Sequence, residues 1–138
     1  MARILAIDYG LKRTGIAVTD PLQIIATGLT TIDSQGLIPF LKKYFLQEAV
    51  ELIIIGEPKN WDESDTHATP LVKDIIKKLQ KEFPQIALKT VDERYTSKMA
   101  KQAMIEMGMK KKDRQKKGNI DQIAATIMLQ QYLKALNF

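Results

Sequence analysis

The sequence predicts an α/β domain whose sheet joins three antiparallel strands to two parallel ones. The first third of the chain has strand-like runs at residues 3–8 and 15–19 and within 24–32, with short turn-rich links. After these runs helical and strand patterns alternate, as parallel strands require a crossover between them. A length of 138 residues fits one domain over residues 1–138, a five-stranded mixed sheet flanked by helices.

The elements after the third strand follow from apolar spacing. Residues 37–48 have helical spacing, with Pro39 in the first turn, and the apolar run 50–55 predicts a strand covered on both faces. Residues 59–69 are polar and predict a loop. The remaining patterns predict a helix at 70–83, a strand at 86–91, a helix at 97–107, and a helix at 120–136 that is capped by Asn119 and has Ile123, Ala124, Ile127 and Met128 as its apolar stripe.

Composition excludes several kinds of site. The chain has no cysteine, which excludes disulfides and thiolate metal sites, and its one histidine, His67, has no second histidine with which to share a metal. The start "MARILAID" reaches an acid too early for a secretory signal, and no apolar run approaches the roughly 20 residues of a membrane helix. We expect a soluble cytoplasmic protein without membrane contact.

The positive charge is concentrated in one segment. The net charge is +5, and residues 108–118, "GMKKKDRQKKG", contain six basic residues and one acid. Such a segment is typical of contact with a polyanion such as nucleic acid. A solvated linker, whose lysines only aid solubility, explains the charge of this segment equally well.

Acidic residues follow three of the predicted strands. Asp8, Glu57 and the pair Asp92–Glu93 are expected at one edge of the sheet, because the carboxyl ends of parallel strands meet there. Each acid has a simpler role by itself, as a turn or capping residue, and Asp121 is favoured in a first helical turn by the helix dipole. Together they supply the hard oxygen ligands of a Mg²⁺-dependent phosphodiesterase.

Four ordered motifs resemble one family along essentially the whole chain. The motifs are "ILAIDYGLKRTGIAVTD", "LIIIGEPKNWDESD", "VDERYTS" and "NIDQIAATIMLQQYL". Their order and spacing are similar to those of the YqgF family, also called RuvX. The resemblance implies an RNase H-like fold, related to the RuvC resolvases. It also implies nuclease activity on branched DNA or at the 5′ end of pre-16S ribosomal RNA.

The resemblance also implies the site residues. By position, Asp8, Glu93 and Asp121 become the catalytic metal-binding triad, with Asp92 as the alternative middle ligand. Glu57 stands where the family usually has leucine, so it is a further candidate. The expected cofactor is Mg²⁺, or Mn²⁺, with Asp8 bridging two ions. The predicted nucleic-acid contacts are Lys12, Arg13, Arg94, Lys110, Lys111, Lys112, Arg114, Lys116 and Lys117.

Two other functions remain open at this point. The chain could be an RNA-binding ribosome-biogenesis factor without catalysis, since the acids would also be retained as capping residues. A phosphate- or ATP-binding fold is a weaker alternative, because such proteins need a second lobe around the nucleotide and the chain is short for that. Symmetric cleavage of a junction would call for a homodimer, which one sequence leaves undecided.

Overall fold

A five-stranded mixed sheet forms the centre of the computed structural model, which describes residues 2–57, 69–92 and 117–136. The strand order is β3-β2-β1-β4-β5, with β1 antiparallel to β2, β2 antiparallel to β3, and β1, β4 and β5 parallel. The predicted mixture of three antiparallel and two parallel strands is therefore confirmed. The strands are β1 Arg3–Tyr9, β2 Arg13–Thr19, β3 Ala26–Asp33, β4 Val50–Glu57 and β5 Ala87–Asp92.

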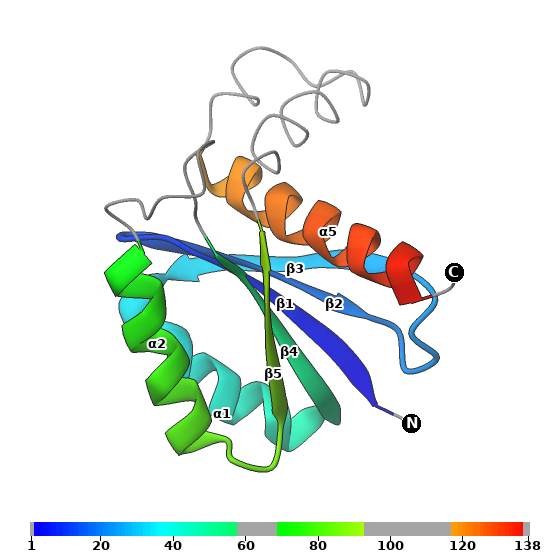
Figure 1. Cartoon of the computed structure of the whole chain (residues 1–138), viewed down its shortest axis with the longest axis horizontal. Coiled ribbons are helices and arrows are strands. Elements are labelled where there is room, and N and C mark those ends of the chain that lie inside the picture. Colours follow the sequence, from blue (N-terminus) through cyan, green and yellow to red (C-terminus); the bar gives the residue numbers. More distant parts are fainter. Residues whose placement is uncertain (1, 58–68, 93–116, 137–138) are drawn as a thin grey trace.

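Helices cover both faces of this sheet. The short 3-10 helix η1, Ser34–Gly36, leads into α1, Leu37–Gln47, and α2 spans Thr69–Glu82. The last described helix, α5, spans Lys117–Leu136. Figure 1 shows α1 and α2 on one face and α5 on the other. The two faces thus have separate cores, which we call the α1–α2 face and the α5 face.

Side-chain alternation along β1 builds both cores at once. Leu5 and Ile7 are fully buried in the cluster with α1 and α2, while Ile4 and Ala6 belong to the cluster with α5. Small residues on the α5 face let the helix approach closely: Ala6 and Ala17 are fully buried, and a Cβ on Gly28 would lie 2.6 Å from the Gln122 side chain. The same alternation occurs in β4, where Ile53 and Ile55 belong to the cluster with α1 and α2 and Ile54 to the cluster with α5, so the strand predicted at 50–55 is covered on both faces as expected.

The structure corrects several element boundaries. Glu57 and Asp92 are the last residues of β4 and β5, not turn residues after them, because the two strands stay paired through Glu57 and Asp92. Asn119 lies inside α5 rather than at its cap, since the helix begins at Lys117. The predicted loop reaches only to residue 68 at most, because Thr69 is the first residue of α2.

Of the apolar stripe predicted for the last helix, one residue of four packs in the cluster on the sheet. Met128 packs on the sheet, but its companions there are Ala125, Leu129 and Leu133. Ala124 and Ile127, with Ile123 beside them, form a separate cluster. The helix therefore has apolar side chains on more than one side, which a single-stripe interpretation misses. The predicted loop at 59–68 and the helix at 97–107 lie outside the described residues.

Within the described ranges, no helix is both long enough and apolar enough to cross a membrane.

A carboxylate shapes the turn between β2 and β3. Asp20 accepts hydrogen bonds from the backbone N–H groups of Leu22, Ile24 and Ile25, at 3.1, 2.8 and 2.7 Å. Gln23 has a left-handed φ of 59° within this turn, and its N–H donates to the Asp20 carbonyl at 2.9 Å. The hydrogen bond from Ile25 is the main cause that lowers the pKa of the Asp20 carboxyl; partial burial opposes it.

The Asp20 turn should therefore make stability depend on pH. Because folding lowers the pKa of Asp20, its contribution is present above the unfolded pKa of about 3.9 and is lost as pH falls through the folded pKa. We expect Asp20→Ala to lower the free energy of unfolding at pH 7, and the difference from wild type to shrink at lower pH. Urea unfolding at pH 7, 5 and 3 measures it. A difference that stays constant over this range would contradict the assignment.

Candidate active site

The candidate site begins where β1 leaves the core. Ile4 to Ile7 are buried, and Asp8 and Tyr9, which follow them at the end of the strand, are half-buried. Asp8 follows Ile4 and Ala6 by steps of two, so it belongs to the α5 face. Tyr9 packs against the other core, and burial raises the pKa of its phenol. On the α5 face of β1, Asp8 is thus the polar residue that follows the buried apolar residues Ile4 and Ala6.

The neighbours of Asp8 in the two adjacent strands, β2 and β4, are both glycines. Its partner on β2 is Gly15, and on β4 Gly56 follows Ile55, which is in register with Ile7. Neither neighbour has a side chain to fill the space beside the carboxylate. Glycine in a strand often marks a place where a ligand approaches the sheet closely. Glycine at both positions leaves Asp8 without a bulky strand neighbour, as a site for an ion or a phosphate group would require.

The hairpin between β1 and β2 brings positive charge next to Asp8. Lys12 is exposed and Arg13, the first residue of β2, is half-buried. The Gly10 N–H donates to the Arg13 carbonyl at 3.0 Å, which closes the loop. A Cβ on Gly10 would lie 2.6 Å from that carbonyl oxygen, so only glycine fits. The hairpin places Lys12 and Arg13 shortly after the end of β1, and their contact with a phosphate beside Asp8 stays a prediction.

Another acid at this edge, Glu57, lies on the opposite face of the sheet from Asp8. Glu57 follows Ile53 and Ile55 by steps of two, which places it on the α1–α2 face, opposite to Asp8. The strand position of Asp92 is in register with Glu57. Glu57 therefore does not share the α5 face on which Asp8 lies. This arrangement favours a residue other than Glu57 as the partner of Asp8.

The first turns of α5 lie toward the same edge as Asp8. The opposite end of the helix, at Leu133 and Lys134, lies beside Ile24–Ala26, where β3 begins next to the end of β2. Asp121 is in the second turn, four residues before Ala125, which is fully buried against the sheet. The helical position of Asp121 is therefore on the side of α5 that faces the sheet, toward the carboxyl ends of β1 and β4.

Much of the predicted site lies outside the described residues. Glu93, Arg94 and residues 110–116 of the basic segment are among them, as are Trp61 and His67, and Lys117 is described only as the start of α5. Among the described side chains, no group of three or more acidic or histidine residues is arranged to hold a metal. The triad of Asp8, Glu93 and Asp121 therefore stays a prediction, of which the structure places Asp8 and the helical position of Asp121.

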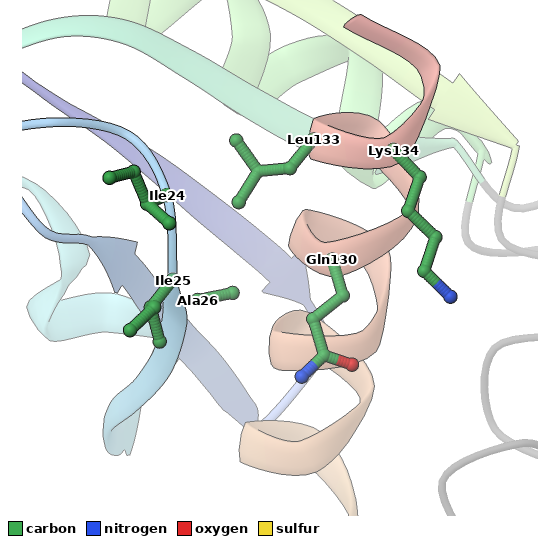
Figure 2. Close-up of a pocket in the computed structure, with 6 residues that line it drawn as sticks. All are labelled: Ile24, Ile25, Ala26, Gln130, Leu133 and Lys134. Carbon is green, nitrogen blue, oxygen red and sulfur yellow. The ribbon is translucent and has the colours of Figure 1, made fainter. Parts of the chain in front are cut away.

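A hollow lies at the opposite end of the sheet. It has a volume of about 420 Å³ and is lined by the start of β3 and the last turns of α5 (Figure 2). In that view Ile24 and Leu133 lie on opposite sides of the hollow. The lining includes Lys134 but no carboxylate. It therefore lacks the oxygen donors of the predicted chemistry, which lie at the other edge.

Sequence comparison identifies the family. The sequence model of the RuvX family, described as Holliday junction resolvase, matches residues 2–135. The chain belongs to the RuvX family. A protein of Flavobacterium psychrophilum named "Putative pre-16S rRNA nuclease" is 56% identical over 133 residues, which are 96% of this chain and 97% of that protein. A protein of the same name from Flavobacterium johnsoniae is 53% identical over the full length of both chains.

A solved structure shares the fold of this RuvX-family chain. T. thermophilus RuvC, in complex with a Holliday junction substrate, aligns with a TM-score of 0.57. The alignment covers 99% of this chain and 96% of RuvC at 14% identity. The likeness shows the fold alone, and with the observed strand order it confirms the RNase H-like fold that the motifs predicted.

Two residues of the site region were not predicted. The buried hydroxyls of Thr14 and Ser34 lie 2.8 Å apart beneath the hairpin loop. Thr14 belongs to a strand pattern and Ser34 follows an aspartate in "IDSQG", where serine reads as an ordinary turn residue. Ser34 is buried because it bonds to a loop 24 residues earlier in the chain. No local signal in the sequence tells such a serine apart from an exposed one.

The Gly10 contact gives a direct test of the hairpin. We expect Gly10→Ala to lower the free energy of unfolding by about 1–3 kcal/mol, because the added methyl group must displace the Arg13 carbonyl. Gly36→Ala is the matched control, since a Cβ at Gly36 meets nothing within 4 Å. Urea unfolding of both variants makes the measurement. Equal stability of the two variants would show that the loop does not need glycine at residue 10.

Proposed function

We propose that the chain is a single-domain nuclease that hydrolyses phosphodiester bonds in structured nucleic acid. The observation that carries the proposal is the placement of Asp8. It is a carboxylate at the end of a buried central strand, with glycine on both sides and a basic hairpin loop beside it. Membership of the RuvX family and the fold shared with RuvC agree with it.

The residues that fit a divalent metal are oxygen donors. With no cysteine and one histidine in the chain, carboxylates are the available ligands, and they suit Mg²⁺ or Mn²⁺. Asp8, Glu93 and Asp121 would hold the metal, on β1, after β5 and on α5. When bound, such a metal lowers the pKa of a water and stabilises the leaving oxygen of the phosphodiester. The neighbours of Asp8 in β2 and β4 are glycines, so no side chain of an adjacent strand competes for the Asp8 carboxylate.

The remaining roles, a fixed negative charge and contacts to the phosphates, belong to residues of the chain itself. Asp8 supplies negative charge at a fixed point, because β1 is paired on both sides up to this residue. Lys12 and Arg13 neutralise phosphate oxygens next to it, a contact that positions the backbone without reading bases. The basic segment, with Lys110, Lys111, Lys112, Arg114, Lys116 and Lys117, extends that contact along the substrate, together with Arg94.

We assign structured RNA or branched DNA as the substrate. The close relatives carry the name of a pre-16S rRNA nuclease, and the structural neighbour binds a Holliday junction. Processing of pre-16S rRNA would place the protein in the cytoplasm. Cleavage of a junction would require a homodimer, since two strands must be cut symmetrically. The substrate experiment below separates these two alternatives.

Loss of the Asp8 charge should abolish cleavage. We expect Asp8→Asn to lower the rate of Mg²⁺-dependent cleavage about 100-fold or more, because even residues that only support a metal ligand are worth 10–100-fold. The substrates are a precursor 16S rRNA fragment, a four-way DNA junction and a linear DNA duplex, each with Mg²⁺ or Mn²⁺.

The control for this experiment is Asp74→Asn, which removes an exposed carboxylate of α2. It should cleave as wild type does. Cleavage that is unchanged in Asp8→Asn would overturn the assignment of Asp8. Binding without cleavage by wild type would favour the RNA-binding factor, and binding of ATP alone would favour the nucleotide-binding alternative.

The positive charge of Lys12 should increase the dependence of nucleic-acid binding on salt. In Asp8→Asn protein, we expect Lys12→Ala to reduce the slope of log affinity against log salt by about 0.7–0.9, the value for one lost phosphate contact. Lys43→Ala, which removes an exposed lysine of α1, should leave the slope unchanged. Fluorescence anisotropy between 50 and 200 mM salt measures both. Equal slopes for the two variants would remove Lys12 from the interface.

A further inference from the structure

Ser34 is a buried hydroxyl that connects the end of β3 to the hairpin loop beside Asp8. It is 4% exposed and is the first residue of η1, directly after β3. Its side chain donates to the Gly10 carbonyl at 2.5 Å, across 24 residues of sequence. Its backbone N–H donates to the Lys12 carbonyl at 2.9 Å. One residue therefore makes two hydrogen bonds to the same loop.

The donors and acceptors fix the direction of this network. A serine hydroxyl has one proton, and Ser34 must give it to Gly10 because a carbonyl can only accept. The 2.8 Å contact between the hydroxyls of Thr14 and Ser34 is therefore donated by Thr14, which is 0% exposed. The hydrogen bonds run from Thr14 to Ser34 and from Ser34 to Gly10. Because both hydroxyls are buried, loss of one leaves the other without its partner and away from water.

Ser34 is the hydrogen-bond partner of two backbone carbonyls of the loop. In residues 10–13, the Gly10 N–H and the Arg13 carbonyl bond to each other at 3.0 Å. The carbonyls of Gly10 and Lys12 are bonded to Ser34. Leu11, with a side chain that is 78% exposed, has no core contact that could hold the loop in place. The two hydrogen bonds from Ser34 therefore hold the carbonyls of Gly10 and Lys12, on either side of Leu11.

We propose that Ser34 is a positioning residue for nucleic-acid binding, which holds the loop of residues 10–13 so that Lys12 and Arg13 lie beside Asp8. The inference rests on the proposed nuclease function and adds the residue that orders its phosphate-binding loop. A fixed loop loses less conformational freedom when a phosphate binds, so more of the contact energy remains as affinity. Ser34 itself touches no substrate in this scheme and acts through the backbone of Gly10 and Lys12.

The test compares Ser34 with Thr19, a second buried residue whose hydroxyl makes hydrogen bonds. Thr19 is 1% exposed, accepts from the Ile4 N–H at 2.9 Å and donates to the Asp20 carbonyl at 2.9 Å, at the opposite end of β2. Thr19→Val removes this hydroxyl and leaves the loop untouched. We expect Ser34→Ala and Thr19→Val each to lower Tm by about 3–6 °C. A purely structural role for Ser34 would make the two variants alike in every other measurement.

Binding and cleavage should separate the two variants. We expect Ser34→Ala to raise KM for the cleaved substrate about tenfold with kcat nearly unchanged, and to reduce the salt slope of binding as Lys12→Ala does. Thr19→Val should change neither. Adding Lys12→Ala to Ser34→Ala should weaken binding little further, because both act on one loop. If Ser34→Ala does not fold, Thr14→Val, which removes the donor to Ser34, gives the same comparison.

The outcomes are distinguishable from failure of the proposed function. If wild type neither binds nor cleaves RNA or branched DNA, the nuclease proposal is overturned and the role of Ser34 with it. If wild type binds and cleaves but Ser34→Ala matches Thr19→Val in KM and salt slope, only the role of Ser34 is overturned. Additive losses in Ser34→Ala with Lys12→Ala would likewise show that the two residues act independently.

Discussion

The burial of β1 from both faces is the constraint on which the rest of the structure depends. Leu5, Ala6 and Ile7 are 0% exposed, and the strand is paired with β2 on one side and β4 on the other. Apolar side chains must therefore alternate between two cores, and a charged residue is tolerated only where the layers end. Asp8 occupies that point. Its position follows from the core, before any catalytic role is considered.

The same constraint brings distant parts of the sequence to one edge. Because β1, β4 and β5 are parallel, their carboxyl ends lie together, and α5 crosses the sheet with its first turns toward that edge. Alanine at residues 6 and 17 and glycine at residue 28 allow the helix to lie close to the strands. The face of the sheet then distinguishes the acids: Asp8 is on the α5 face, whereas Glu57 is on the α1–α2 face. The face on which each acid lies is set by the alternation of side chains along its strand, not by its distance along the chain.

A second layer of contacts prepares the loop next to Asp8. The hydroxyls of Thr14 and Ser34 satisfy each other and the Gly10 carbonyl in a place that water does not reach. Buried polar groups of this kind are costly unless every partner is present, so they tend to fix one conformation. In a nuclease, an ordered phosphate-binding loop improves affinity without adding a contact to the substrate. The hollow at the far end of α5 has no comparable link to Asp8.

The sequence alone was enough to predict the order of the described elements, the mixed sheet and the place of Asp8 at the end of the central strand. Strand and helix periods are local, and the apolar run before Gly56 is enough to predict a buried strand, so these features need no knowledge of the fold. Only the tertiary structure decided that Asn119 lies within α5, that Ala125 and Leu129 rather than Ala124 and Ile127 meet the sheet, and that Glu57 faces away from Asp8. It also revealed Ser34 beneath the hairpin loop. The physical reason is that faces and long-range hydrogen bonds are set by packing between layers, which no short stretch of sequence contains.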